Sequence, residues 1–150
     1  MAETLIRRAL PRILVIDDDE GVRATLEIML QEAGLDVLMA RDGNQGLDLF
    51  LANPVDLVIT DMQMPLKNGT QTISEIRRKD PRVPIIAMSG GSLTAKSDLL
   101  TAACKNGADR IIEKPFDYDD LSALVRDLLS GRTGASGGVA VGERNTAGGR

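Results

Sequence analysis

The chain has 150 residues, of which 43% are hydrophobic and 27% charged, so its size and composition fit a soluble domain with one hydrophobic core. A net charge of −4 argues against a standing nucleic-acid surface, and two Phe and one Tyr are too few aromatics for base stacking. The absence of histidine excludes a Ser-His-Asp triad, a histidine-ligated metal and a phosphohistidine, and a single cysteine excludes an intrachain disulfide. Because no apolar run approaches the roughly 18 residues that cross a bilayer, we expect a cytoplasmic protein.

Short apolar runs alternate with segments of helical period through the first part of the chain. Residues 13–16 are an aliphatic run that predicts a strand buried on both faces. The helix after it ends at Gly34. A second short strand, at 37–39, precedes a helix that ends before Pro54. The apolar stripes of these two helices consist of Val22, Leu26, Met29, Leu30 and Ala33, and of Leu47, Phe50 and Leu51.

The same alternation continues through the second part of the chain. A third strand is predicted at 55–60 and a loop at 61–69, followed by a helix through Ile73 and Ile76. A fourth strand at 84–88 leads to a helix near 95–106. A fifth, short strand at 111–112 precedes the clearest amphipathic stripe, made by Leu121, Leu124, Val125, Leu128 and Leu129.

Five strand–helix units in succession predict an α/β fold of the (βα)5 type, a doubly wound parallel five-stranded sheet with helices on both faces. The units by themselves do not fix the order of the strands. We expect a domain at 12–130, preceded by an N-terminal extension at 1–11. Residues 131–150 hold seven of the fifteen glycines without apolar period and are interpreted as a flexible tail, or as a linker to a further domain.

Residues with useful chemistry follow four of the predicted strands. Asp17-Asp18-Asp19 follows the first strand, Asp61 the third, Ser89-Gly90 the fourth and Lys114-Pro115-Phe116 the fifth. The carboxyl ends of parallel strands meet at one edge of an open α/β sheet, where ligands bind. We therefore expect several carboxylates, one amine and one hydroxyl to share a site.

Clustered carboxylates repel each other, so either their pKa values rise or a cation joins them. Carboxylate oxygens together with water suit Mg²⁺, whereas the lack of histidine and the lone cysteine make zinc improbable. An aspartate can also attack phosphorus and form an aspartyl phosphate. Lys114 would then supply positive charge to the phosphoryl group, and Ser89 a hydrogen bond.

These motifs together resemble the response-regulator receiver family over residues from about 12 to about 130. The segments that carry the resemblance are Ile13–Asp19, Asp61–Pro65 with Gly69, Ser89-Gly90 and Lys114–Phe116. The resemblance implies a flavodoxin-like strand order, 2-1-3-4-5. It also implies a role for each site residue. Asp17 and Asp18 hold Mg²⁺ together with the backbone carbonyl of Gln63. Asp61 is the phospho-acceptor, Ser89 is the switch hydroxyl, and Lys114 contacts the phosphoryl group and precedes a cis proline.

The resemblance further implies partners. A histidine kinase or a histidine phosphotransfer protein would supply the phosphoryl group, and a downstream protein would bind the face formed by the fourth helix, fifth strand and fifth helix. A homodimer is an alternative readout, and we expect neither direct nucleic-acid binding nor membrane binding. We expect no enzymatic activity apart from the domain's own phosphorylation and dephosphorylation. One departure is Ile111, which stands where the family often has Tyr or Phe.

Two other functions remain open from the sequence. Haloacid-dehalogenase-type phosphatases use a strand-end Asp-x-Asp motif that Asp17-Asp18-Asp19 resembles, but Gly21 occupies the usual Thr position. A pseudo-receiver would bind partners without phosphorylation, although all the acceptor-site residues are present here. Labelling by acetyl phosphate separates the last reading from a phospho-accepting receiver.

Overall fold

The computed structural model describes residues 10–64, 67–90 and 107–131, and within them five parallel strands form one sheet. The strand order is β2-β1-β3-β4-β5, and every neighbouring pair is parallel, which confirms the predicted fold and order. The strands are β1 (Arg12–Ile16), β2 (Asp36–Ala40), β3 (Leu57–Asp61), β4 (Ile85–Ser89) and β5 (Arg110–Glu113).

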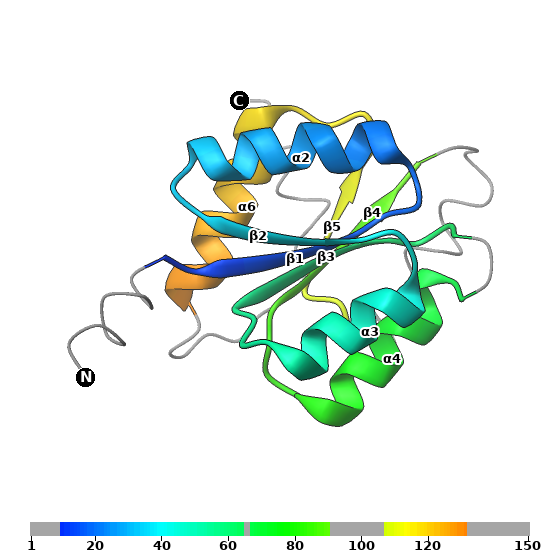
Figure 1. Cartoon of the computed structure of the whole chain (residues 1–150). Helices are drawn as coiled ribbons and strands as arrows, with labels where there is room; N and C mark the ends of the chain where they lie inside the picture. Colours follow the sequence, from blue (N-terminus) through cyan, green and yellow to red (C-terminus); the bar gives the residue numbers. More distant parts are fainter. Residues whose placement is uncertain (1–9, 65–66, 91–106, 132–150) are drawn as a thin grey trace.

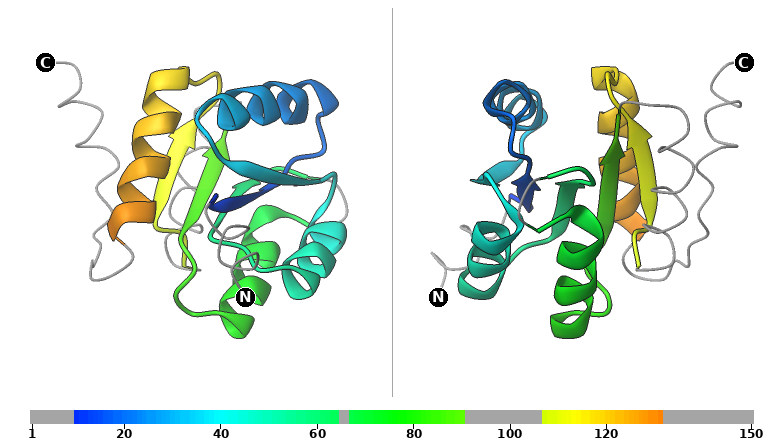
Figure 2. Two further views of the ribbon diagram at one scale, coloured as in Figure 1. Left: turned by 60° about the vertical axis from the view of Figure 1, so that its left-hand side comes forward. Right: turned by 90° about the vertical axis from the view of Figure 1, so that its right-hand side faces the viewer.

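Helices cover both faces of the sheet, as Figure 1 shows. The described helices are α2 (Glu20–Glu32), α3 (Gly43–Ala52), α4 (Gly69–Lys79) and α6 (Tyr118–Ser130). The helix expected near 95–106 lies outside the described residues. In Figures 1 and 2, α2 and α6 lie on one side of the sheet, and α3 and α4 lie on the other.

The sheet separates two aliphatic cores. On the α2 and α6 face, alternate strand residues such as Ile13 and Ile59 pack with Leu26 and Leu124. On the other face, the intervening strand residues pack with Ile73 and Ile76 of α4 and with the apolar side of α3. Strands β1, β3 and β4 are almost entirely buried, as continuous aliphatic runs predict for the centre of a parallel sheet.

Polar side chains at the strand–helix turns fix where three helices begin. Asp19, Asp42 and Asn68 are N-caps, and each accepts a hydrogen bond from the backbone N–H three residues later. Asn68 and Gln71 form a reciprocal capping box. At the other end of α2, Gly34 has φ +84°, a left-handed conformation that ends the helix with little strain.

The structure differs from the sequence prediction at several element ends. Asp61 and Ser89 are the last residues of their strands because each still pairs with a neighbour, Asp61 with Met88 and Ser89 with Glu113. Ala33 is exposed, since it is the C-cap of α2. Leu51 is 56% exposed at the end of α3. None of the helices in the described part of the chain has the length and apolar character needed to cross a membrane.

Candidate functional site

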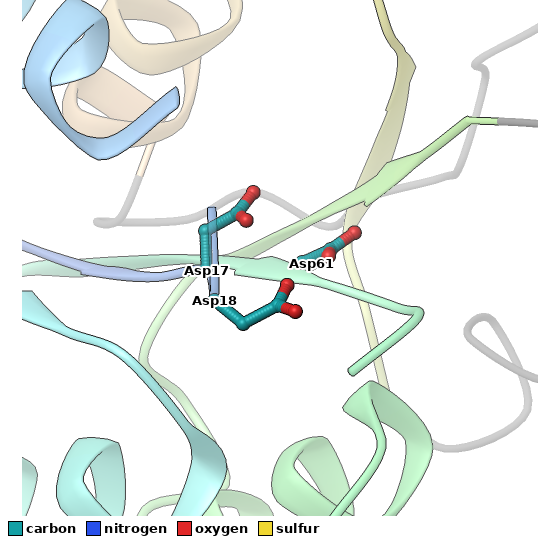
Figure 3. Close-up of side chains that lie close together, drawn as sticks. All are labelled: Asp17, Asp18 and Asp61. Atoms are coloured by element: carbon teal, nitrogen blue, oxygen red, sulfur yellow. The ribbon is translucent and has the colours of Figure 1, made fainter. Parts of the chain in front are cut away.

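The structure brings the acidic residues of β1 and β3 together at the carboxyl edge of the sheet. Carboxylate oxygens of Asp17, Asp18 and Asp61 all lie within 4.8 Å of one another. Figure 3 shows these three side chains gathered where the two strands end. Lys114, which follows β5, places its Nζ 2.9 Å from Asp17 Oδ2 and 3.3 Å from Asp61 Oδ1.

Asp17 is fully buried, and its polar atoms all have partners. Its N–H donates to the carbonyl of Ala40, and its Oδ1 accepts from the N–H of Asp19 at 2.8 Å. Its Oδ2 accepts from Lys114, and its backbone carbonyl accepts from Arg23 Nη1 at 2.8 Å. Asp18 is exposed instead, so its carboxylate is open to solvent next to a fixed neighbour.

Burial and the neighbouring carboxylate make Asp61 a weaker acid than an ordinary aspartate, so its carboxyl holds its proton more tightly. Burial raises the pKa of Asp61 to about 6, and the negative charge of Asp17 adds to the effect. The positive charge of Lys114 and a hydrogen bond from the backbone of Gln63 act in the opposite direction. Since Asp61 is 4% exposed, water does little to stabilise its charge, and a cation at this edge would.

Lys114 is held between the two buried carboxylates. Its burial opposes the charged form, but the hydrogen bond from Lys114 to Asp17 and the charge of Asp61 outweigh burial, so the pKa of Lys114 lies above its ordinary value. Its backbone N–H donates to the carbonyl of Ser89 at 2.6 Å, and the Lys114–Pro115 peptide is cis, as the resemblance implies. Lys114 therefore stays charged and fixed at the end of β5.

Ser89 and Gln63 complete the set of predicted site residues. Ser89 is fully buried, and within the described residues its Oγ has no hydrogen-bond partner. A buried hydroxyl without a partner is unfavourable, so it is available to an incoming group. Gln63 is exposed and lies beside Asp61 at the rim of the site.

The loop after Asp61 is held by close packing of Gly69. A Cβ at this position would lie 2.4 Å from the backbone oxygen of Asp61, so a larger residue would push against the end of β3. The N–H of Gly69 also donates to the carbonyl of Met62 at 3.2 Å. The glycine therefore lets α4 begin directly against the end of β3.

A cavity of about 860 Å³ opens over the three carboxylates and Lys114. Beyond the predicted residues it is lined by the first turns of α2, including Gly21, Val22 and Thr25. Sequence reasoning placed Val22 on the apolar stripe of the helix, considered Gly21 only against the phosphatase motif, and did not single out Thr25. It also missed Arg23, because a contact between a guanidinium and a backbone carbonyl has no motif of its own.

The donor set fits a hard divalent cation. The clustered ligand atoms are all carboxylate oxygens, which Mg²⁺ and Ca²⁺ prefer, and neither sulfur nor imidazole takes part. Asp17 keeps one oxygen on Lys114, whereas Asp18 is exposed beside the cavity. Such a cation would offset the surplus of negative charge at this edge.

Comparison with known proteins identifies the family to which a chain with this fold and these motifs belongs. Residues 13–126 match the family model of the response regulator receiver domain. The chain belongs to the response regulator receiver family. This receiver is also similar to the solved structure of a response regulator receiver domain protein from Clostridium thermocellum, with a TM-score of 0.75 and 32% identity over 81% of this chain and 95% of that chain.

Curated relatives contain a similar receiver segment within longer chains. The receiver is 39% identical over 118 residues to the probable transcriptional regulator ycf27 of Porphyridium aerugineum, covering 79% of this chain and 48% of the relative. It is 32% identical over 126 residues to the autoinducer 1 sensor kinase/phosphatase LuxN of Vibrio harveyi, covering 84% of this chain and 14% of the relative. The chain thus spans about half, or less, of the length of these relatives.

Proposed function

We propose that this receiver accepts a phosphoryl group on Asp61 from a phosphohistidine donor in the presence of Mg²⁺, and that the modification switches protein–protein interactions. The observation that carries the proposal is the cluster of three carboxylates with one lysine, in which Lys114 Nζ lies 3.3 Å from Asp61 Oδ1. The receiver would extend over residues 12–130, with 1–11 and 131–150 as flanking segments.

In the proposed transfer, an oxygen of Asp61 attacks phosphorus. The bond between phosphorus and the donor's imidazole nitrogen breaks as the new P–O bond forms, and the imidazole leaves with the electron pair. Asp17, Asp18, Asp61 and the backbone carbonyl of Gln63 would hold Mg²⁺, which when bound neutralises charge on the phosphoryl oxygens. Lys114 would pair with one of those oxygens, because it already lies beside Asp61.

Ser89 would report the modification to the rest of the domain. Its buried Oγ has no partner among the described residues, so donating a hydrogen bond to a phosphoryl oxygen removes an unfavourable state. That contact favours one of two conformations of the domain. Ile111 packs in the core at 6% exposure, so an aliphatic side chain takes the place of an aromatic ring in this response.

The proposed partners follow from the proposed phosphohistidine donor. A histidine kinase or a histidine phosphotransfer protein would supply the phosphoryl group in the cytoplasm, since this chain has no histidine of its own. The output would be a downstream protein, or a second copy of this chain. It would bind the face that β5 and α6 form with the helix predicted near 95–106. Self-catalysed phosphorylation and dephosphorylation are the reactions proposed for the domain itself.

The test is labelling by acetyl phosphate, with the modified residue located by mass spectrometry. We expect one phosphoryl group on Asp61, labelling that requires Mg²⁺, and loss of labelling in Asp61→Asn. Asp48→Asn is the matched control, because Asp48 is an exposed aspartate on α3, away from the cavity.

Three outcomes would contradict the proposal in different ways. Equal labelling of Asp61→Asn and wild type removes Asp61 as the acceptor. Labelling that is equally fast in excess chelator removes the metal. A wild-type protein that takes no label from acetyl phosphate or from a phosphohistidine donor is a phosphorylation-independent binding module.

A further inference from the structure

Arg23 contacts the acidic turn from one turn inside α2. Its Nη1 donates to the backbone carbonyl of Asp17 at 2.8 Å, and its own backbone N–H donates to the carbonyl of Asp19 at 3.0 Å. Arg23 is half-buried. Gly21 and Val22, which precede it, line the cavity, whereas Arg23 is not among the described lining residues. Its guanidinium therefore holds the backbone of the site from outside the cavity.

The contact closes the set of bonds that fixes Asp17. The N–H of Asp17 is held by Ala40 of β2, and its carboxylate is held by Asp19 and Lys114. The backbone carbonyl is the remaining polar atom, and Arg23 is the described residue that donates to it. Because Asp17 is fully buried, loss of this donor would leave a buried carbonyl unpaired, and the turn carrying Asp18 would shift to reach water.

We propose that Arg23 is a positioning residue for the cation site: by binding the carbonyl of Asp17, it fixes the Asp17–Asp18 turn in the geometry that binds Mg²⁺. The inference rests on the proposed function, since it assumes that these carboxylates bind the ion. Groups that orient metal ligands commonly change affinity by about 10-fold to 100-fold when removed.

The sign of the effect separates positioning from simple charge. Arg23 carries a positive charge close to the carboxylates, so as a point charge it opposes cation binding. Removal of that charge would then tighten binding. Positioning predicts the reverse, that Mg²⁺ binds more weakly although the site has become more negative. A purely structural role would lower stability without this specific loss of affinity.

The experiment measures Mg²⁺ binding to the full chain by isothermal titration calorimetry, with urea unfolding of each variant in parallel. We expect Arg23→Met to raise the Kd for Mg²⁺ by about 10-fold. Arg23→Lys keeps the charge, but its shorter side chain does not place a donor where Nη1 lies on the carbonyl of Asp17, so it should also weaken binding. In acetyl phosphate labelling, the Mg²⁺ concentration for half-maximal rate should rise, while the rate at saturating Mg²⁺ changes little.

Arg41→Gln is the matched control for charge. Arg41 follows β2 at the same edge of the sheet, is exposed, and has its Nε 3.9 Å from Asp42. Its removal should leave the Kd unchanged or slightly lower. An unchanged or lower Kd in both Arg23 variants would overturn the inference. If Arg23→Met does not fold, Arg23→Lys alone decides. Failure of the wild type to bind Mg²⁺ would instead overturn the metal part of the proposed function.

Discussion

The two edges of the sheet differ in how their carboxylates are paired with cationic side chains. At the amino edge, where the strands begin, carboxylates face guanidinium groups: Arg12 Nε lies 2.7 Å from Asp36 Oδ2, and Arg77 Nη2 lies 2.9 Å from Asp109 Oδ2. At the carboxyl edge, among the described residues, three clustered carboxylates meet the amine of Lys114. Each carboxylate of these two amino-edge pairs has its own guanidinium, whereas the three clustered carboxylates share one amine.

This difference separates residues that stabilise the fold from residues kept for function. Asp61 at the carboxyl edge is harder to ionise in the folded protein, because burial raises its pKa. Functional sites commonly violate the rules that stabilise the remaining structure. The carboxyl edge should therefore become more stable when its charge is removed, and the amino edge less stable.

The largest stability effect should come from Arg77 at the amino edge. Its guanidinium donates to the carbonyls of Gly107 and Val83 and to Asp109, so it ties the end of α4 to the start of two strands. We expect Arg77→Met to lower the free energy of unfolding by about 2–4 kcal/mol in urea titrations, because the carbonyl of buried Val83 and the half-buried acceptors on Gly107 and Asp109 all lose their donor.

Arg78→Met is the control for Arg77→Met, since Arg78 is the exposed neighbour on the same helix. It should change stability by less than about 0.5 kcal/mol. Below its unfolding transition, Arg77→Met should still take label from acetyl phosphate. A loss of labelling at full folding would show that the two edges are not independent.

The next effect is a gain of stability in Asp61→Asn that depends on pH. Burial raises the pKa of Asp61 from 3.8 to about 6, so the folded protein binds this proton more tightly than the unfolded chain does. Above about pH 6 the wild type carries the unfavourable buried charge in full. As pH falls from about 6 to about 4, the folded carboxyl becomes protonated first and the disadvantage disappears.

We therefore expect Asp61→Asn to be about 2–3 kcal/mol more stable than wild type at pH 8 without Mg²⁺, since a tenfold change in proton affinity corresponds to about 1.4 kcal/mol. The difference should shrink towards zero near pH 4. Urea unfolding at a series of pH values measures it. Asp48→Asn controls for the loss of one negative charge. A difference that grows as pH falls would contradict the burial of the ionised carboxylate.

The smallest effect should come from the ion pair between Arg12 and Asp36. The two side chains are 33% and 44% exposed, so solvent screens the pair. We expect Arg12→Gln to cost about 1 kcal/mol or less in urea unfolding, with a smaller loss in high salt. A loss as large as that of Arg77→Met would mean that exposure does not decide the strength of pairs at this edge.

The carboxyl edge was largely predictable from the sequence because its chemistry lies in local motifs. Asp17, Asp61 and Lys114 each follow an aliphatic run, and parallel strands place such residues at one edge. The strand order itself came from the resemblance, because alternating units do not determine which strands are neighbours. Ser89 and Asp61 lie inside their strands, since pairing across the ladder extends further than the apolar run.

The amino edge and the supporting contacts were not predictable. Arg77 and Arg23 bind backbone carbonyls that are brought near them by folding, and nothing in the sequence distinguishes these arginines from exposed ones such as Arg78. Leu51 shows the converse limit: its helical period predicts burial, yet it lies at the end of α3 and is 56% exposed. Periodicity predicts a helix face but not how far the neighbouring layer extends.

The most direct test of the central claim, that the carboxyl edge holds a surplus of negative charge suited to a cation, is urea unfolding at pH 8 over a series of Mg²⁺ concentrations. Wild type should gain stability with the logarithm of Mg²⁺ above the Kd, about 1.4 kcal/mol at ten times the Kd. Asp18→Asn removes the exposed carboxylate of the cluster and should lose most of this gain. Equal stabilisation of both proteins, or none in either, would contradict the account.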